Sequence, residues 1–265
     1  MEADPLFEPD PASPDIYIPS LYTRGPWDPG LLHGGPVGAL FAERLQDASG
    51  DAYQPARLTV ELMRPVPLLP MRMRVNDLRV GRRLRVVEAL LEADGKGVAR
   101  ATLLSVRPLP LDASGLNPPL RPPPGGPRRE GVESVSLDGG TGFVGGSMDF
   151  RREPDHELGR GVAWLRLHRQ VLPGRDPSPL ARAAAAADVG NAVSARRDPG
   201  LPRISFVNAD LSLSLSRLPE GEWIRLEAEG RWEATGIGWV TAEMADERGS
   251  VGRVSNALVL APDTR

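Results

Sequence analysis

Hydrophobic and polar residues alternate along several segments of the chain. Between Leu58 and Leu62 every second residue is apolar, and Thr59 and Glu61 lie between them. Segment 211–215 has the same pattern, with leucines separated by serines. Successive side chains of a β-strand point to opposite faces of its sheet, so this alternation predicts strands with one buried and one solvated face. Similar patterns at 71–75, 84–90 and 224–228 predict further strands of the same kind.

The strand-rich regions occur twice, in copies that share one register. Arg64 and Arg217 each follow an alternating strand and are 153 residues apart. Arg100 and Arg253 are separated by the same interval, so the register holds over about 36 residues. An internal repeat of this length indicates two structural units built on one plan.

Each copy carries one helix ahead of its strands. After His33, a proline at position 36 and apolar residues with helical spacing predict a helix that extends to about Leu45. Its counterpart spans 179–188 and contains five consecutive alanines, which are slim and apolar on every side. A helix without a polar face is expected to be buried, so we predict that it lies at the centre of a sheet.

A proline-rich segment separates the two copies. Between Pro108 and Pro127, eight of twenty residues are proline, and a glycine-rich stretch follows at 139–146. Proline cannot donate to a hydrogen-bond ladder and favours extended geometry, so this composition predicts a linker. The glycine-rich stretch lacks the Lys-Ser/Thr of a phosphate-binding loop and is assigned to the same linker. We therefore expect an N-terminal repeat at 1–106, a linker at 107–145 and a C-terminal repeat at 146–265.

Composition and charge narrow the class of protein. The chain has 265 residues, of which 40% are hydrophobic, and it contains no cysteine, which excludes a disulfide-rich scaffold. A net charge of -3 gives no basic excess for a nucleic-acid backbone. No apolar run approaches the roughly 20 residues of a membrane helix, and the N-terminus is acidic and proline-rich rather than a signal sequence. We expect a soluble cytoplasmic protein with neither a nucleic-acid partner nor a membrane span.

Several motifs in this order resemble those of the acyl-CoA thioesterase superfamily, and most closely its thioesterase II type. The resemblance covers about residues 15 to 261. Its motifs are His33-Gly34-Gly35, Gln54–Val60, Met63–Pro67, Val80–Arg83, Ala187-Asp188, Phe206–Asp210, Gly221–Trp223 and Gly252–Asn256. The resemblance implies an α+β double hotdog fold. In such a fold two central helices are each wrapped by about five antiparallel strands, and the halves join as an intramolecular pseudo-dimer with an acyl groove between them.

The resemblance also implies a catalytic set. In that family an aspartate near the end of the second-half helix assists water attack on the thioester, and a Thr and a Gln help to hold the water. By position the aspartate falls on Asp188, the Thr on Asn208 and the Gln on Asn256, with Ser205 and Ser255 as near-register alternatives. Both asparagines depart from the family residues, and Asn256 is one methylene shorter than a glutamine.

Asp188 is also notable on local energetics. A negative charge at the C-terminal end of a helix interacts unfavourably with the macrodipole, so an aspartate here suggests a role other than helix stability. One interpretation is a general base in an apolar groove. The other is an ordinary capping residue ahead of Gly190. The first-half helix has Ala42 where small hotdog thioesterases carry their acid, with Glu43 next to it, so this helix is predicted to lack the catalytic carboxylate.

Substrate contacts are predicted at two places. Backbone N–H groups of His33-Gly34-Gly35 at a helix N-terminus would polarise a thioester carbonyl, although a plain loop before a helix has the same sequence. Arg82 and Arg83, with Arg79 and Arg85 nearby, would contact coenzyme A phosphates, although exposed strand arginines are common.

The leading hypothesis is therefore an acyl-CoA thioesterase without metal or bound cofactor, coenzyme A being part of the substrate. One alternative is a double-hotdog protein that binds an acyl group without catalysis. Another is an enoyl-CoA hydratase that uses Asp28 and His33, which lie five residues apart. His156 and His168 have no metal-ligand spacing. Because hotdog sheets have edges and faces that usually pair, we also expect a homodimer.

Overall fold

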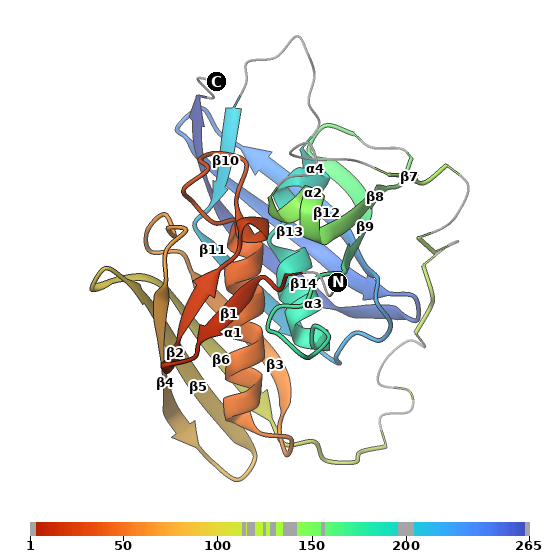
Figure 1. Ribbon diagram of the computed structural model, residues 1–265. Helices are drawn as coiled ribbons and strands as arrows, with labels where there is room; N and C mark the ends of the chain where they lie inside the picture. Colours follow the sequence, from red (N-terminus) through yellow and green to blue (C-terminus); the bar gives the residue numbers. More distant parts are fainter. Residues whose placement is uncertain are drawn as a thin grey trace.

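The computed structural model describes residues 4–112, 115, 120–123, 126–127, 131–134, 142–154, 157–195 and 204–262. Its centre is one antiparallel sheet with the strand order β1-β2-β4-β5-β6-β3-β11-β14-β13-β12-β9-β8-β7, and β10 also pairs with β14. Helices pack on one face of this sheet (Figure 1). This arrangement confirms the α+β class and the antiparallel strands.

The elements fall into two series along the chain. The first series contains β1 (Phe7–Asp10), β2 (Ser13–Pro19), a 3-10 turn (Leu21–Thr23), α1 (Gly34–Ser49), β3 (Gln54–Glu61), β4 (Met71–Val80), β5 (Leu84–Ala93) and β6 (Lys96–Val106). The second contains β7 (Glu133–Ser134), α2 (Phe143–Ser147), β8 (Met148–Arg152), β9 (Arg160–Leu167), α3 (Pro179–Ala187), α4 (Gly190–Ser194), β10 (Ile204–Asn208), β11 (Asp210–Leu215), β12 (Ile224–Trp232), β13 (Ile237–Asp246) and β14 (Gly249–Pro262).

The internal repeat is visible in the strand boundaries. Strands β12, β13 and β14 begin 153 residues after β4, β5 and β6, respectively. The paired arginines have equivalent contacts, because Arg64 donates to the Gly97 carbonyl and Arg217 donates to the Ser250 carbonyl. Those two acceptors are again 153 residues apart. The repeat predicted from the sequence is therefore confirmed.

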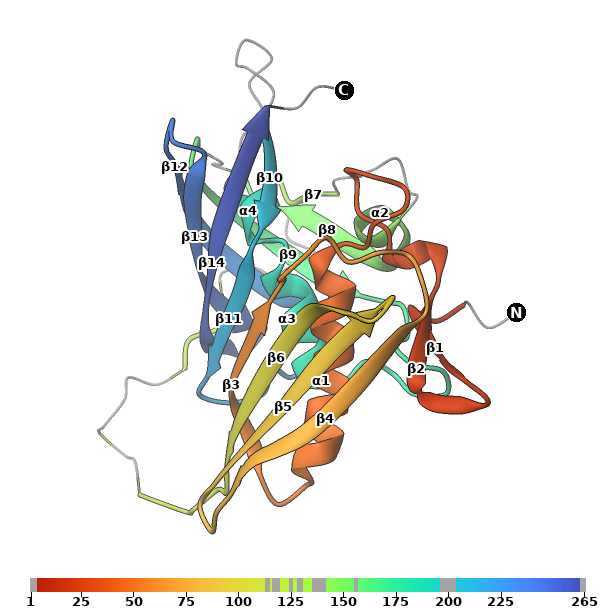
Figure 2. The same ribbon diagram turned by 90° about the vertical axis from the view of Figure 1, so that its left-hand side faces the viewer.

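The two series share one continuous sheet. Strand β3 pairs antiparallel with β11, and Leu58 lies opposite Leu213 at this junction. Both leucines are completely buried. Figure 2 shows the strands of the first series continuing into those of the second, with α1 and α3 behind them. The alternation predicted for these segments thus places one face of each strand against the helices.

Helices α1 and α3 lie side by side within this core. A Cβ built on Gly38 of α1 would lie 3.8 Å from the Cβ of Ala184 in α3, which is ordinary van der Waals contact. The alanines of α3 are buried on every side, with at most 1% of their surface exposed. Small residues at the crossing allow the two helix backbones to approach closely. The prediction of an all-round buried alanine helix is confirmed.

Part of the predicted linker at 107–145 lies outside the described residues. Strand β6 ends at Val106. At the far end of the segment, α2 begins at Phe143, and both Phe143 and Val144 are buried. The glycine-rich stretch therefore ends in a packed helical turn.

Candidate active site at the facing ends of two helices

The N-terminus of α1 meets the C-terminus of α3. His33 is the N-cap of α1, and the helix begins at Gly34 and Gly35 with Pro36 in its first turn, where the missing N–H of proline has no helical partner to lose. At the other side of the contact, Asp188 is the C-cap of α3. The two motifs that the sequence singled out separately thus lie at one place in the fold.

Asp188 is held by residues from both halves of the chain. Its Oδ2 lies 2.7 Å from Nδ1 of His33, and the carboxylate side chain is only 3% exposed. Its Oδ1 accepts a hydrogen bond of 2.5 Å from Nδ2 of Asn208. The same amide nitrogen donates to the Asp188 backbone carbonyl at 2.8 Å. A buried carboxylate with these partners is fixed in orientation, as a general base requires.

Two glycines allow the helix backbone to approach this carboxylate. A Cβ built on Gly34 would lie 2.6 Å from Oδ1 of Asp188, which is closer than real side chains approach. A Cβ on Gly35 would lie 2.4 Å from the ring of Phe143. Both positions therefore need glycine for space. The first turn of α1, whose N–H groups lack helical acceptors, therefore begins next to the Asp188 carboxylate.

Two aromatic side chains enclose His33. The Trp27 ring stacks on the imidazole at 5.5 Å between centroids, and the Phe143 ring lies 5.3 Å away on a tilted plane. The imidazole is accordingly buried. Sequence reasoning missed both residues, because Trp27 belongs to an irregular loop and Phe143 to the glycine-rich stretch. The only available signal was their place near a glycine-rich helix start and at the end of a linker.

The two asparagines occupy different positions around Asp188. Asn208 contacts the carboxylate directly, and its own Oδ1 accepts a hydrogen bond from Asn191 at 3.2 Å. Asn256 is 1% exposed and donates from Nδ2 to the Asp210 carbonyl at 3.1 Å. Its Oδ1 is buried and has no hydrogen-bond partner within the described part of the chain. A Cβ on Gly190, two residues beyond Asp188, would lie 3.8 Å from this oxygen.

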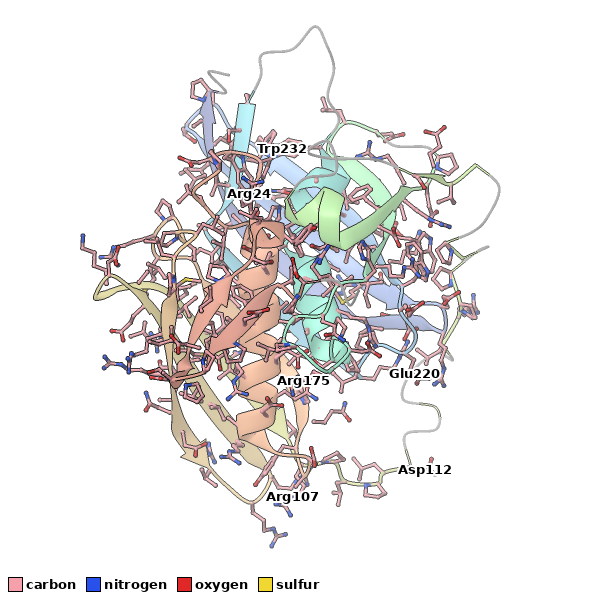
Figure 3. All side chains as sticks on the ribbon, viewed as in Figure 1. Arg24, Arg107, Asp112, Arg175, Glu220 and Trp232 are labelled. Carbon is pink, nitrogen blue, oxygen red and sulfur yellow. The ribbon has the colours of Figure 1, made fainter. Side chains whose placement is uncertain are left out.

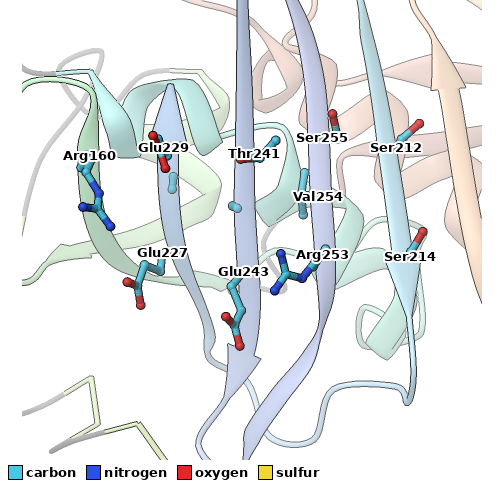
Figure 4. Close-up of a pocket in the computed structure, with 12 residues that line it drawn as sticks. Arg160, Ser212, Ser214, Glu227, Glu229, Thr241, Glu243, Arg253, Val254 and Ser255 are labelled. Atoms are coloured by element: carbon cyan, nitrogen blue, oxygen red, sulfur yellow. The ribbon is translucent and has the colours of Figure 1, made fainter. Parts of the chain in front are cut away.

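The two serine alternatives face away from the site. Ser205 precedes Asn208 by three residues on β10, so the two side chains lie on opposite faces of that strand. Ser255 is exposed, whereas its neighbour Asn256 is buried. Ser255 instead lines a shallow groove of about 440 Å³ on the outer face of the second-half strands (Figure 4). The groove is lined by charged and hydroxyl side chains that include Arg160, Ser212, Ser214, Glu227, Glu229, Thr241, Glu243 and Arg253. It lies on the opposite face of the sheet from Asn256.

Arg82 and Arg83 lie at the far end of α1. They are exposed in the turn between β4 and β5, next to Gly81, whose carbonyl accepts a hydrogen bond from the Tyr53 hydroxyl. Tyr53 follows the C-terminus of α1, and a 16-residue helix is about 24 Å long. Figure 3 shows Arg107, which lies over the Tyr53 ring, at the opposite end of the molecule from Arg24. The structure thus does not bring these two arginines to Asp188.

Asp28 does not pair with His33. Its side chain is exposed and accepts a hydrogen bond of 2.7 Å from the Gly30 N–H within the same loop. His33 has Asp188 as its carboxylate partner instead. The pairing of residues 28 and 33 that the sequence suggested for a hydratase is therefore wrong, because loop 28–30 turns back on itself.

A second carboxylate occupies the equivalent position on the other helix. Asp188 lies ten residues after Ser178, the N-cap of α3, and Glu43 lies ten residues after His33, the N-cap of α1. Glu43 reaches the start of α3, where it accepts the Ser178 N–H at 2.8 Å and pairs with Arg175 at 2.9 Å. The first-half helix thus carries a buried acid, Glu43, as many residues after its N-cap as Asp188 is after that of α3.

The two carboxylates differ in their electrostatic surroundings. Burial raises the pKa of Glu43, and the Ser178 N–H and the Arg175 guanidinium lower it in part. Arg175 satisfies the charge of Glu43, and Pro179 removes one N–H from the first turn of α3. At Asp188 the corresponding partner is an imidazole, and the adjacent turn has Gly34 and Gly35. At the Asp188 end the carboxylate thus lies beside a glycine-rich first turn, whose Gly35 N–H donates to Nδ1 of His33.

Within the described ranges, no three His, Asp or Glu side chains gather as metal ligands would. No helix in that part of the chain has the length and apolarity needed to cross a membrane.

Comparisons with known proteins agree with this architecture. The acyl-CoA thioesterase N-terminal domain family matches residues 23–106, and the acyl-CoA thioesterase C-terminal domain family matches residues 117–260. Acyl-CoA thioesterase II TesB2 from Mycobacterium marinum is 13% identical, with a TM-score of 0.63 over 94% of this chain and 93% of that chain. A protein with a hot dog fold from Alicyclobacillus acidocaldarius is 15% identical, with a TM-score of 0.69 over 94% and 93%.

The tesB protein of Mycobacterium avium subs paratuberculosis is 15% identical, with a TM-score of 0.63 over 93% of both chains. No curated protein matches the sequence. Identities this low support the hot dog fold alone, whereas the two family matches together extend over both halves of the chain. The chain therefore belongs to the acyl-CoA thioesterase family.

Proposed function

We propose that the protein hydrolyses acyl-CoA thioesters to a free acid and coenzyme A at the Asp188 site. The observation that carries the proposal is the buried Asp188 carboxylate, which lies against Gly34 and is bonded to His33 across the two halves. A base and backbone N–H donors then flank one position, which is the arrangement that acyl transfer to water needs.

In the proposed reaction Asp188 removes a proton from a water molecule, and the water oxygen attacks the thioester carbonyl carbon. The carbonyl electron pair moves onto oxygen, and the N–H groups of Gly34 and Gly35 stabilise this oxyanion. When the tetrahedral intermediate collapses, the C–S bond breaks and the coenzyme A thiolate takes the proton from Asp188. No group beyond the substrate and water is consumed.

Asn208 and Asn256 are assigned supporting roles. Asn208 orients the carboxylate through its amide, where the family uses a Thr. Asn256 presents its buried, unpartnered Oδ1 toward Gly190, and we propose that this oxygen accepts a hydrogen bond from the attacking water. The Gln of the family would reach further by one methylene, so the water position is expected to shift toward β14.

We further propose that the two halves act as an intramolecular pseudo-dimer, with the acyl chain in a groove between them. A second copy of the chain is expected to pair with the first through exposed sheet surface, giving a homodimer that light scattering would detect.

The test is free-thiol release from acyl-CoAs that range from acetyl to palmitoyl and include an aryl thioester. Wild type is compared with Asp188→Asn and with Glu43→Gln, the same change at the equivalent position of the other helix. We expect release in wild type and Glu43→Gln and none in Asp188→Asn, which should still fold and bind acyl-CoA. Unchanged release in Asp188→Asn would refute the assignment. Binding of acyl-CoA by calorimetry without any thiol release would favour a non-catalytic acyl-binding protein.

The imidazole–carboxylate pair favours one second candidate, an enoyl-CoA hydratase. Such an enzyme needs one group to deprotonate water and another to protonate the α-carbon, and His33 with Asp188 supplies two titratable groups at 2.7 Å. It predicts loss of enoyl absorbance from an unsaturated acyl-CoA, without thiol release. Absence of that change would exclude the hydratase.

A further inference from the structure

The Nδ1 atom of His33 has two neighbours that make opposite demands on it. The Gly35 N–H lies 3.2 Å away and donates to Nδ1. Oδ2 of Asp188 lies 2.7 Å away, on the same atom. A ring nitrogen of histidine either accepts a hydrogen bond through its lone pair or donates its one hydrogen, and it cannot do both.

The two demands correspond to two protonation states of the pair, which differ in whether Nδ1 carries a hydrogen. When Asp188 is ionised, its oxygen has no hydrogen, so the 2.7 Å contact requires the hydrogen on Nδ1. The Gly35 N–H then faces another N–H and has lost its acceptor. When Asp188 carries a proton and the one hydrogen of the neutral imidazole is on Nε2, the lone pair of Nδ1 is available, and the Gly35 N–H is bonded to it. The base form of Asp188 and an engaged Gly35 N–H therefore exclude each other.

We infer that His33 is a positioning residue. While Asp188 is ionised, Nδ1 carries a hydrogen and the Gly35 N–H is free for the substrate carbonyl oxygen, and Nδ1 keeps that hydrogen when Asp188 takes the proton of the attacking water. This inference rests on the proposed thioesterase function and deepens it. The thioester carbonyl oxygen then replaces Nδ1 as the acceptor of the Gly35 N–H. The N–H that would stabilise the oxyanion therefore becomes available when Asp188 is in its base form. The ligand recognised by the released N–H is a carbonyl or oxyanion oxygen, in line with an acyl thioester.

The surroundings of His33 keep the imidazole in this position. Its backbone N–H donates to the Thr23 carbonyl at 2.8 Å. The rings of Trp27 and Phe143 lie against the imidazole at 5.5 and 5.3 Å between centroids, and His33 is buried. Gly35 is itself held close to the Phe143 ring. These contacts hold Nδ1 between the Gly35 N–H and Asp188, so its protonation state decides which of the two it bonds.

The test compares His33→Asn with His33→Ala in the full chain. Asparagine is a strong N-cap, and its Oδ1 can hold the Gly35 N–H permanently while Nδ2 faces Asp188. We expect kcat for acyl-CoA hydrolysis to fall by about 10²-fold, as on loss of one oxyanion donor. Alanine removes the cap but leaves the Gly35 N–H free, so a smaller loss, within roughly tenfold, is expected. The expected order of kcat is therefore His33→Ala above His33→Asn.

A purely structural role of His33 predicts the reverse order, because the Asn cap preserves the helix start that Ala disrupts. Urea unfolding of both variants provides the second measurement, and His33→Asn is expected to be at least as stable as His33→Ala. Ser178→Ala removes the equivalent cap of α3, whose hydroxyl accepts the Ala181 N–H, and serves as the matched control with unchanged kcat.

Higher kcat in His33→Asn than in His33→Ala would overturn the inference while leaving the proposed function intact. Absence of Asp188-dependent thiol release in the wild type would overturn both. The two failures are thus distinguishable in one set of assays.

Discussion

Replacing Gly34 by alanine tests whether the position of the Asp188 carboxylate determines activity. The added Cβ would lie 2.6 Å from Oδ1 of Asp188, and ordinary contacts begin at 3.4 Å, so the carboxylate would have to withdraw by about 0.8 Å. That displacement would stretch its bonds to His33 and Asn208, now 2.7 and 2.5 Å. A misplacement of about 1 Å at a reacting group costs on the order of 10²-fold in rate.

The effect of Gly34→Ala on folding is expected to be smaller. Steric overlap in a packed site typically costs about 1–3 kcal/mol, and the higher helix propensity of alanine offsets up to about 1 kcal/mol of this cost. Gly38→Ala, one turn later in α1, is the matched control because its Cβ would meet Ala184 only at 3.6 Å or more. We expect Gly38→Ala to keep wild-type thiol release and equal or higher stability.

The assay is thiol release at saturating and limiting acyl-CoA, with urea unfolding of each variant. The expected result is a loss of kcat confined to Gly34→Ala. Wild-type kcat in Gly34→Ala would refute the reasoning, because it would show that the carboxylate can move by this distance without consequence. An equal loss in Gly38→Ala would attribute the effect to the helix pair as a whole.

Three further predictions follow from buried polar groups. Glu43→Gln should keep thiol release. Because burial raises the folded-state pKa of Glu43, the free energy of unfolding of the wild type should fall as pH rises from the unfolded-state pKa to the folded-state pKa. Urea unfolding should show no such fall in the Glu43→Gln variant. Asp246→Asn should lower the free energy of unfolding by about 3–5 kcal/mol, because Asp246 is completely buried against Arg217. Asp77→Asn, which changes an exposed carboxylate paired with Arg85, should lower it by under about 1 kcal/mol, and equal losses would contradict this. Asn208→Ala removes a charge-assisted hydrogen bond worth about 1.5–3 kcal/mol, so kcat should fall by roughly tenfold or more, and an unchanged kcat would exclude Asn208 from orienting the base.

Asp246 also predicts how the protein responds to acid. Burial raises the pKa of its carboxyl, but hydrogen bonds from Arg217 and from backbone N–H groups outweigh burial and hold the pKa below its usual range. Its contribution to stability is therefore present above the unfolded-state pKa and is lost as pH falls through the folded-state pKa. Urea unfolding of wild type and Asp246→Asn between neutral pH and pH 3 should converge at the acid end, and parallel curves would contradict this.

Much of the fold could be predicted because its signals are local. Alternation at Leu58–Leu62 and 211–215 reflects the two faces of a pleated strand, and the 153-residue repeat reproduces that pattern in both halves. The alanine run of α3 indicates burial without any knowledge of neighbours. Local preferences of this kind are independent of which strands pair, so they can be derived from the chain alone.

The sequence indicated where α1 begins and where α3 ends, but not that these two helix ends are in contact. The sequence identified Asp188 and His33-Gly34-Gly35 as separate features, each with a local reason. It could not show that they meet, because their contact depends on how α1 packs against α3, where Gly38 lies against Ala184. It named Glu43 but did not match it to Asp188, since the equivalence of positions 43 and 188 depends on counting from the two N-caps that the structure defines.

Strand register separates candidate site residues from their neighbours. Positions 255 and 256 are adjacent in sequence, but a strand sends them to opposite faces, so Ser255 lines the outer groove and Asn256 faces the core. The length of α1 places Arg82 and Arg83 far from Asp188. The sequence by itself determined the strands, the two buried helices and the chemical types at the site. The tertiary structure alone decided which of them touch, because long-range contacts depend on register and on helix packing rather than on local preference.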